Sequence, residues 1–279
     1  MENTIIYEHE LVPYAPHDLP HGPYLVFAPH PDDETLGMGG TIALAVEKGI
    51  DVSVVFATNG EKGGDPDVRK KEAEAAVKVL GVKKLFYLNL PDREIFSTPF
   101  PEERVAQIME EVTPSTVFLP SLQEIHPDHR AMTHKVLSFS KRKQYVYDLW
   151  LYEINRHGEI NRLIDITHVV DKKEQAIVCF QSQLEQLDYK SNALCLDFTR
   201  GVTLGQGSDY AEGFWRHGFS PENESPEQAY SDHILKYHLN QGGRGAVSPG
   251  NENKKPVFRV FDSIVGIVAR LKRAVSCRE

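Results

Sequence analysis

The sequence predicts an α/β protein built on a doubly wound, mostly parallel sheet with helices on both faces. Three observations support this prediction. Short apolar runs rich in β-branched residues recur along the first half of the chain, amphipathic segments separate them, and a polar cluster follows each run. Continuous apolar strands joined by helical crossovers are typical of a parallel sheet that is buried on both faces.

The first half of the chain contains four predicted strands that alternate with three predicted helices. Each strand is a short apolar run, and each helix repeats its apolar residues with helical spacing. The predicted strands are YLVFA (24–28), VSVVFAT (52–58), KLFYLNL (84–90) and TVFLPS (116–121), and the predicted helices span 37–48, 66–80 and 101–112.

The second half of the chain is less regular. We expect Tyr210, Phe214 and Trp215 to be core residues rather than a platform for a ligand. The predicted elements are a strand at YDLWLYEI (147–154), a helix near 170–184 and a short helix at DYAEGFWRHG (209–218).

The chain changes character after residue 240. The segment QGGRGAVSPGNENKKP is dense in Gly, Pro, Asn and Ser, a composition typical of a linker. We therefore expect one domain over residues 1–240, a linker over 241–256 and an amphipathic helix over 257–279.

The predicted C-terminal helix has one apolar stripe and a largely basic polar surface. Two interpretations stay open. The stripe can dock on the domain or on a second copy of the chain, or it can enter a membrane interface while the cations meet anionic headgroups. The stripe consists of Val257, Val260, Phe261, Ile264, Val265, Val268, Leu271 and Val275, and the polar surface of Arg259, Asp262, Arg270, Lys272, Arg273 and Arg278.

Composition excludes several classes of protein. The 279 residues, 41% hydrophobic and 25% charged, suit one large globular domain or a domain with an appendage. A net charge of −9 is unsuited to a nucleic-acid partner. Cys179, Cys195 and Cys277 fit neither a disulfide framework nor a CxxC metal site. With no secretory signal and no apolar run of membrane-spanning length, we expect a cytoplasmic protein, peripheral at the inner membrane face if the C-terminal helix binds lipid.

Polar clusters follow all four predicted strands of the first half. Ligands of open α/β sheets bind beyond the carboxyl ends of the strands. Loops rich in His and Asp at successive strand ends are therefore better explained by one shared site than by four unrelated surface loops. In chain order the clusters are HPDDE, TNGEKGG, LPDRE and QEIHPDH.

The first cluster has the residues of a metal site. His30 and Asp33 are three positions apart at a strand-to-helix turn, so a nitrogen and an oxygen can converge on one ion. This donor pair suits zinc, although iron, manganese or cobalt could substitute. Either His126 or His129 could complete a site that keeps a position open for water, as catalytic zinc sites do. Alternatively, the acids cap the next helix, and for Glu34 we favour capping or support of a neighbouring ligand over ligation.

Five stretches together resemble the zinc-dependent de-N-acetylases of the LmbE-like group, which includes the N-acetylglucosaminyl-phosphatidylinositol (PIG-L) deacetylases. They are FAPHPDDETLGMGG, ATNGEKGG, RKKEAEAAVKVLGV, PDRE and HPDHRA. The resemblance covers about residues 22–215. It implies a Rossmann-like fold, a bound Zn²⁺ or another divalent metal, and removal of an acetyl group from a small N-acetylated sugar conjugate.

The resemblance also implies a role for each of eight residues. His30, Asp33 and His129 correspond to metal ligands, Asp32 to the general base, His126 to the group that polarises the oxyanion, Asp128 to a residue that orients a histidine, and Arg69 and Asp92 to substrate-binding residues.

The roles agree with the chemistry of amide hydrolysis, which needs an activated water, a stabilised oxyanion and a proton for the leaving amine. An amidase or deacylase acting on a non-sugar amide is the alternative, because the motifs define the chemistry better than the substrate. A nucleotide-binding protein is disfavoured, since APHPDDE lacks the GxGxxG pattern. A sugar-binding module without activity would not need the ligand set together with Asp32.

Overall fold

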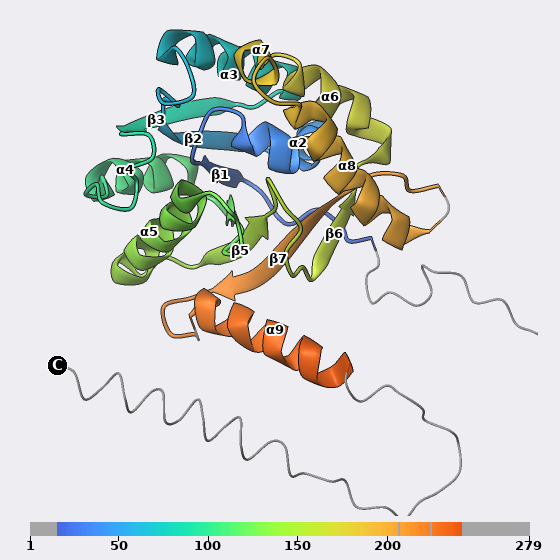
Figure 1. Cartoon of the computed structure of the whole chain (residues 1–279). Helices are drawn as coiled ribbons and strands as arrows, with labels where there is room; N and C mark the ends of the chain where they lie inside the picture. Colours follow the sequence, from blue (N-terminus) through green and yellow to red (C-terminus); the bar gives the residue numbers. More distant parts are fainter. Residues whose placement is uncertain (1–15, 206, 224, 242–279) are drawn as a thin grey trace, which may run out of the picture. The chain divides into compact units, whose positions relative to one another are not determined.

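A computed structural model describes residues 16–205, 207–223 and 225–241. Their strands form a seven-stranded sheet in the order β3-β2-β1-β4-β5-β7-β6 (Figure 1). Strands β1 to β5 run parallel, and β7 is antiparallel to both of its neighbours. The predicted doubly wound, mostly parallel sheet is confirmed.

The strands and helices have the following bounds. The strands are β1 (Tyr24–Ala28), β2 (Val52–Thr58), β3 (Lys84–Leu90), β4 (Thr116–Pro120), β5 (Tyr147–Tyr152), β6 (Arg162–Asp165) and β7 (Ala211–Phe219). The α-helices are α2 (Asp33–Glu47), α3 (Pro66–Leu80), α4 (Glu102–Val112), α5 (Pro127–Lys143), α6 (Val170–Ile177), α7 (Gln181–Leu184), α8 (Tyr189–Gly201) and α9 (Pro226–Gln241).

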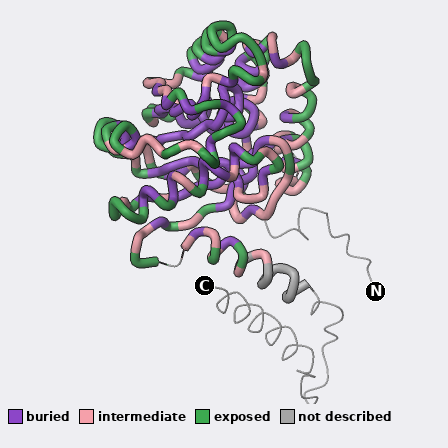
Figure 2. Tube along the Cα trace, turned by 60° about the vertical axis from the view of Figure 1, so that its left-hand side comes forward, coloured by how far each residue is buried: buried purple, intermediate pink, exposed green. Residues whose placement is uncertain are grey.

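Helices cover both faces of the sheet, as the packing of strand β1 illustrates. Tyr24 and Val26 pack into a core with side chains of α2, α3 and α6, whereas Leu25 and Phe27 pack into a second core with α4 and α5. All five residues of β1 are buried, because each face of this central strand meets a layer of helices. Figure 2 shows the buried residues concentrated along the strands and the exposed ones on the outer helix surfaces.

The order of the strands places the two His-Asp motifs side by side. β1 pairs with β2 on one side and with β4 on the other, so the chain reverses its direction of winding between β1 and β4. Ligands of doubly wound sheets bind in the crevice at this switch point. The loop after β1 carries His30, and the loop after β4 carries His126.

The predicted short helix at 209–218 is wrong, because this segment forms strand β7. β7 lies between β5 and β6 and pairs with both. Its cross-strand hydrogen bonds and the burial of Phe214 and Trp215 outweigh a weak local preference for helix. The expectation that Phe214 and Trp215 are core residues is confirmed, and Tyr210 packs against the same core.

Other predicted elements differ mainly at their ends. α2 begins at Asp33, four residues before the predicted start at residue 37. The predicted helix near 170–184 is two helices, α6 and α7. Strand β6 and helices α5, α8 and α9 have no counterpart among the predicted elements.

The predicted linker over 241–256 and the predicted helix over 257–279 lie outside the described residues, apart from Gln241, which ends α9. The described residues from 16 to Ile234 form one compact unit. The proposed division into a domain, a linker and a C-terminal helix therefore stays a prediction. Across the described part of the chain, no helix combines the length and apolarity needed to cross a bilayer.

Candidate active site

The turn from β1 into α2 presents the first motif. Asp32 precedes the helix with a φ of 132°, a conformation that costs energy for a non-glycine residue. The backbone N–H of His30 donates to Asp33 Oδ2 over 2.8 Å, which fixes the side chain of the first helical residue. Glu34 is buried, accepts from the Thr35 hydroxyl over 2.6 Å and lies 3.4 Å from the backbone nitrogen of Asp32, so its role in capping or in support of the ligands stays a prediction.

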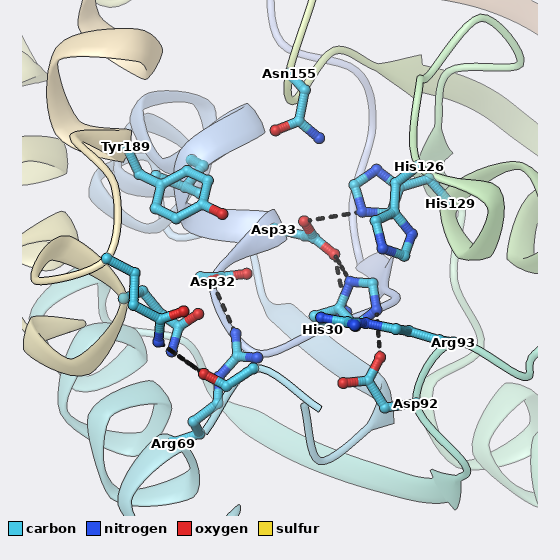
Figure 3. A pocket seen from close by; sticks show the side chains of 14 residues that line it. His30, Asp32, Asp33, Arg69, Asp92, Arg93, His126, His129, Asn155 and Tyr189 are labelled. Carbon is cyan, nitrogen blue, oxygen red and sulfur yellow. Dashed lines mark hydrogen bonds and ion pairs between the residues drawn. The ribbon is translucent and has the colours of Figure 1, made fainter. Parts of the chain in front are cut away.

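Asp33 joins the two motifs. Its Oδ2 lies 3.1 Å from His30 Nδ1, and its Oδ1 lies 3.3 Å from His129 Nε2. Burial opposes the ionisation of Asp33, but His129 and His30 outweigh it and hold the pKa of this carboxyl well below its usual range. One ionised carboxylate therefore faces two imidazole nitrogens from the ends of β1 and β4 (Figure 3).

His129 is oriented by Glu124, which the sequence analysis did not single out. Glu124 Oε2 lies 3.3 Å from His129 Nδ1, while Oε1 accepts from the backbone N–H groups of Ile154 and Asn155. Burial disfavours the imidazolium of His129, yet the Asp33 carboxylate outweighs it and raises the pKa of His129 to about 9. A carboxylate behind a histidine directs the other ring nitrogen towards a metal.

His30 has similar support on its far side. Its Nε2 lies 3.2 Å from Asp92 Oδ1 and 3.4 Å from Asp128 Oδ2. Asp128 also accepts from the backbone N–H of Arg93 over 2.7 Å, and Asp92 Oδ2 accepts from that of Lys62 over 2.9 Å. These contacts agree with the expectation that Asp128 orients a histidine, here His30, and they favour the same role for Asp92. The expected binding of substrate by Asp92 stays a prediction.

Arg69 contacts Asp32. Its Nη2 lies 2.8 Å from Asp32 Oδ2 and 2.7 Å from the carbonyl oxygen of Pro31, and Nη1 donates to the carbonyl oxygen of Gly60. A Cβ at Gly60 would overlap the guanidinium, so the TNGEKGG loop leaves space for this side chain. Burial raises the pKa of Asp32 to about 7 against the attraction of Arg69.

His126 is half-buried and lies next to both other histidines. Its ring centroid is 4.7 Å from that of His30 and 4.9 Å from that of His129. Its Nδ1 accepts from the backbone N–H of Asp128, so the neutral ring carries its proton on Nε2. Burial and the neighbouring His30 lower the pKa of His126, which favours this neutral form.

These groups line one cavity (Figure 3), in which Arg93, Asn155 and Tyr189 lie beside the predicted residues. Of the eight residues implied by the resemblance, seven line the cavity, and Asp128 lies behind His30. Tyr189, Gln183 and Gln186 come from α7, α8 and the loop between them, where the sequence shows no recognisable motif.

The donor atoms fit a divalent metal. Ligand atoms of His30, His126 and His129 lie within 4.8 Å of one another, as do those of His30, Asp92 and Asp128. In the second group both oxygens of Asp128 accept backbone N–H donors, whereas Asp33 accepts one through Oδ2 and turns Oδ1 towards His129. The cavity side of His30, where Asp33 and His129 converge, therefore offers the better nitrogen and oxygen donor set for zinc.

Comparisons with known proteins agree with this geometry. The sequence profile of the PIG-L family, described as GlcNAc-PI de-N-acetylase, matches residues 25–140. A Bacillus cereus protein described as "Probable N-acetyl-alpha-D-glucosaminyl L-malate deacetylase 2" is 32% identical over 186 residues, which are 58% of this chain and 84% of that protein.

A solved structure of the N,N'-diacetylchitobiose deacetylase from Pyrococcus horikoshii, complexed with its inhibitor MPG, is also similar. The TM-score is 0.62 at 27% identity, and the match covers 70% of this chain and 83% of that one. The 4-oxalmesaconate hydratase of Pseudomonas putida is 27% identical over 226 residues, 68% of this chain and 86% of that protein. Two His-Asp motifs meet at one switch point of the sheet, the family profile matches, and two of the similar proteins are named as deacetylases. The chain therefore belongs to the GlcNAc-PI de-N-acetylase (PIG-L) family, the LmbE-like deacetylases.

Proposed function

We propose that this protein is a zinc-dependent N-deacetylase that removes the acetyl group from an N-acetylhexosamine conjugate, releasing acetate and a free amine. The observation that carries the proposal is the different surroundings of two adjacent aspartates. Asp33 faces the imidazoles of His30 and His129, whereas Asp32 pairs with Arg69. The deacetylase names of the relatives support the same reaction.

His30, Asp33 and His129 would hold the metal. A bound zinc ion lowers the pKa of a coordinated water to about 7 and polarises a carbonyl oxygen, which is the chemistry that amide hydrolysis needs. Glu124 and the pair Asp92 and Asp128 keep the two histidine rings in position from behind.

Asp32 acts as the general base. It lies next to a metal ligand but is held by Arg69 on another side, so its carboxylate can accept the proton of the attacking water. The same carboxyl then returns the proton to the departing amine. His126 donates its Nε2–H to the developing oxyanion, because its Nδ1 is already an acceptor.

The walls of the cavity suit a sugar. Gln183, Gln186, Asn155 and Tyr189 bring amide and hydroxyl groups to the cavity that the catalytic groups line. Hydroxyl-rich rings are bound by such mixed donors and acceptors. The amide groups of Gln183 and Gln186 also donate to the carbonyl oxygen of Gly63, and that of Asn155 donates to Glu124, so the protein holds these side chains in place.

A hydratase is the second candidate, because the Pseudomonas putida relative is named for that reaction and covers a similar share of this chain. Both reactions use a water activated by a base. They differ in product, since only the deacetylase releases acetate.

Acetate release distinguishes the candidates. The zinc-loaded protein is incubated with N-acetylglucosamine conjugates, with N-acetylated amines that contain no sugar, and with an unsaturated dicarboxylate. We expect acetate from the sugar conjugates alone and none from the Asp32→Asn variant. Equal release from the non-sugar amides would favour the amidase, and hydration of the dicarboxylate without acetate release would favour the hydratase.

A further inference from the structure

Arg93 is a cation of the cavity that the proposed mechanism does not use. It is exposed and lines the same cavity as His30, where Figure 3 labels both residues. The other arginine of the cavity, Arg69, is buried and paired with Asp32. Among the residues that the structure describes, no carboxylate forms an ion pair with the Arg93 guanidinium, whose one hydrogen bond is to the carbonyl oxygen of Lys62.

The backbone of Arg93 is in the left-handed region, with a φ of 62°. Such residues are uncommon, and most others in this chain have a local reason. Thr113 and Gln144 end helices α4 and α5, and Asn89 is of a type that tolerates the region. Arg93 is the third residue of a tight turn that the Glu94 N–H closes on the Pro91 carbonyl oxygen, a position at which turns accept a positive φ. The backbone therefore reflects the turn, and the case for Arg93 rests on where its side chain lies.

Surrounding contacts hold Arg93 in this conformation. Its backbone N–H donates to Asp128 Oδ2 over 2.7 Å, and its Nη2 lies 3.3 Å from the Lys62 carbonyl oxygen. Next to it, the backbone N–H of Asp92 donates to Glu61 Oε1 over 2.8 Å. Asp128 at the start of α5 therefore holds the backbone of Arg93, and Lys62 in the loop after β2 holds its head group at the edge of the cavity.

The charge of this position is complementary to an anion. The floor of the cavity is acidic, with Asp32, Asp33 and Asp92 among its lining residues, so a negatively charged ligand needs a compensating cation at the edge. A guanidinium binds a carboxylate through two parallel hydrogen bonds, which a neutral group cannot form equally well.

We propose that Arg93 forms an anion subsite that selects N-acetylhexosamine conjugates with an acidic group on the aglycone. This inference rests on the proposed function and narrows its substrate class. The sugar lies against the wall formed by Gln183 and Tyr189, and the acidic group reaches the exposed guanidinium.

The test compares N-acetylglucosaminyl malate with its dimethyl ester, which lacks both negative charges and is larger by two methyl groups. We expect Arg93→Gln to lower the ratio of kcat/KM for the diacid over that for the diester by about 10-fold or more, mainly through KM, as expected for a lost charge-assisted hydrogen bond. Arg93→Lys keeps the charge and should retain part of the preference. Arg104→Gln removes an exposed arginine of α4 outside the cavity and should leave the ratio unchanged.

Two other results would contradict the proposal that Arg93 forms an anion subsite. Equal losses on both substrates would mean that Arg93 only supports Asp128 and His30, and an unchanged ratio in Arg93→Gln would mean that it does not contact the aglycone. If the wild type releases acetate from neither compound, the proposed function itself fails for these substrates. Calorimetric binding of the diacid and diester to zinc-loaded Asp32→Asn, with and without Arg93→Gln, then still decides whether Arg93 selects the charge.

Discussion

Two adjacent carboxyl groups have opposite titration behaviour because they face different neighbours. Burial raises the pKa of Asp32 to about 7, although Arg69 opposes it. At Asp33, burial is outweighed by His129 and His30, and the pKa is held low. Groups whose environments separate their pKa values are a common sign of divided acid, base and ligand roles.

We expect Asp32→Asn to retain the metal and the fold but to lose activity by on the order of 100-fold or more, because an amide cannot accept the water proton. Asp33→Asn should instead lose metal affinity, because it loses the charged oxygens that face His30 and His129. Elemental analysis and acetate release measured on both variants check this. If the two variants exchange these behaviours, the roles of the aspartates are reversed.

Arg69 should control the pH at which Asp32 becomes active. A cation 2.8 Å from a carboxylate favours its ionised form, so removing it raises the pKa of Asp32. Activity requires the ionised base, and the acidic limb of the kcat/KM profile should therefore move to higher pH in Arg69→Gln. Arg69→Lys keeps the charge and should move it less. A loss of activity with an unshifted limb would indicate that Arg69 binds substrate instead, as the sequence resemblance implies.

At the scale of elements, α2 is interrupted. Met38 is fully buried and has non-helical angles, with a φ of −149°, so the helix is kinked there. The carboxylate of Glu212 on β7 accepts from the backbone N–H groups of Gly40 and Thr41 over 2.8 and 2.7 Å, just after the kink. Lys173 of α6 pairs with the same carboxylate over 2.8 Å. β7 and α6 thereby hold the helix whose first turn carries Asp33.

Glu212→Gln should destabilise the fold strongly, because it leaves Lys173, a fully buried cation, with Asp197 as its remaining partner. Breaking a buried ion pair from one side costs about 3–5 kcal/mol. Urea unfolding measures the change. Glu111→Gln is the matched control, since it breaks an exposed pair with Lys84 and should cost about 1 kcal/mol or less. Similar costs for the two variants would contradict the role assigned to Glu212.

At the scale of the molecule, the proposed metal site joins loops from both ends of the first half of the chain. The ligand atoms come together only in the folded state, so a metal that binds there stabilises the fold by mass action. Zinc in 1,000-fold excess over its Kd should add about 4 kcal/mol to the free energy of unfolding. A chelator should reverse this gain. Thermal unfolding measures it, and His30→Ala and His129→Ala should show no response to zinc.

The C-terminal segment gives a prediction for the full chain. Residues 257–279 combine an apolar stripe with basic residues in an otherwise acidic protein. If this segment binds a membrane interface, sedimentation with anionic liposomes should be lost when residues 247–279 are deleted. Equally poor sedimentation of the intact and truncated proteins would assign the stripe to a protein contact instead.

The sequence alone determined the fold class and the chemistry of the first half, because both depend on local patterns. Apolar runs and helical periods predict the parallel strands, and the two His-Asp motifs contain the residues that we propose as metal ligands. The tertiary structure decided which groups support them. Residue spacing does not predict these supporting groups, since each contact depends on how separate loops meet beyond the sheet. They are Glu124 behind His129, Arg69 beside Asp32, and the exposed Arg93 in the cavity. Segment 211–219 is a strand for the same reason: its hydrogen-bonding partners, β5 and β6, are supplied by the rest of the fold.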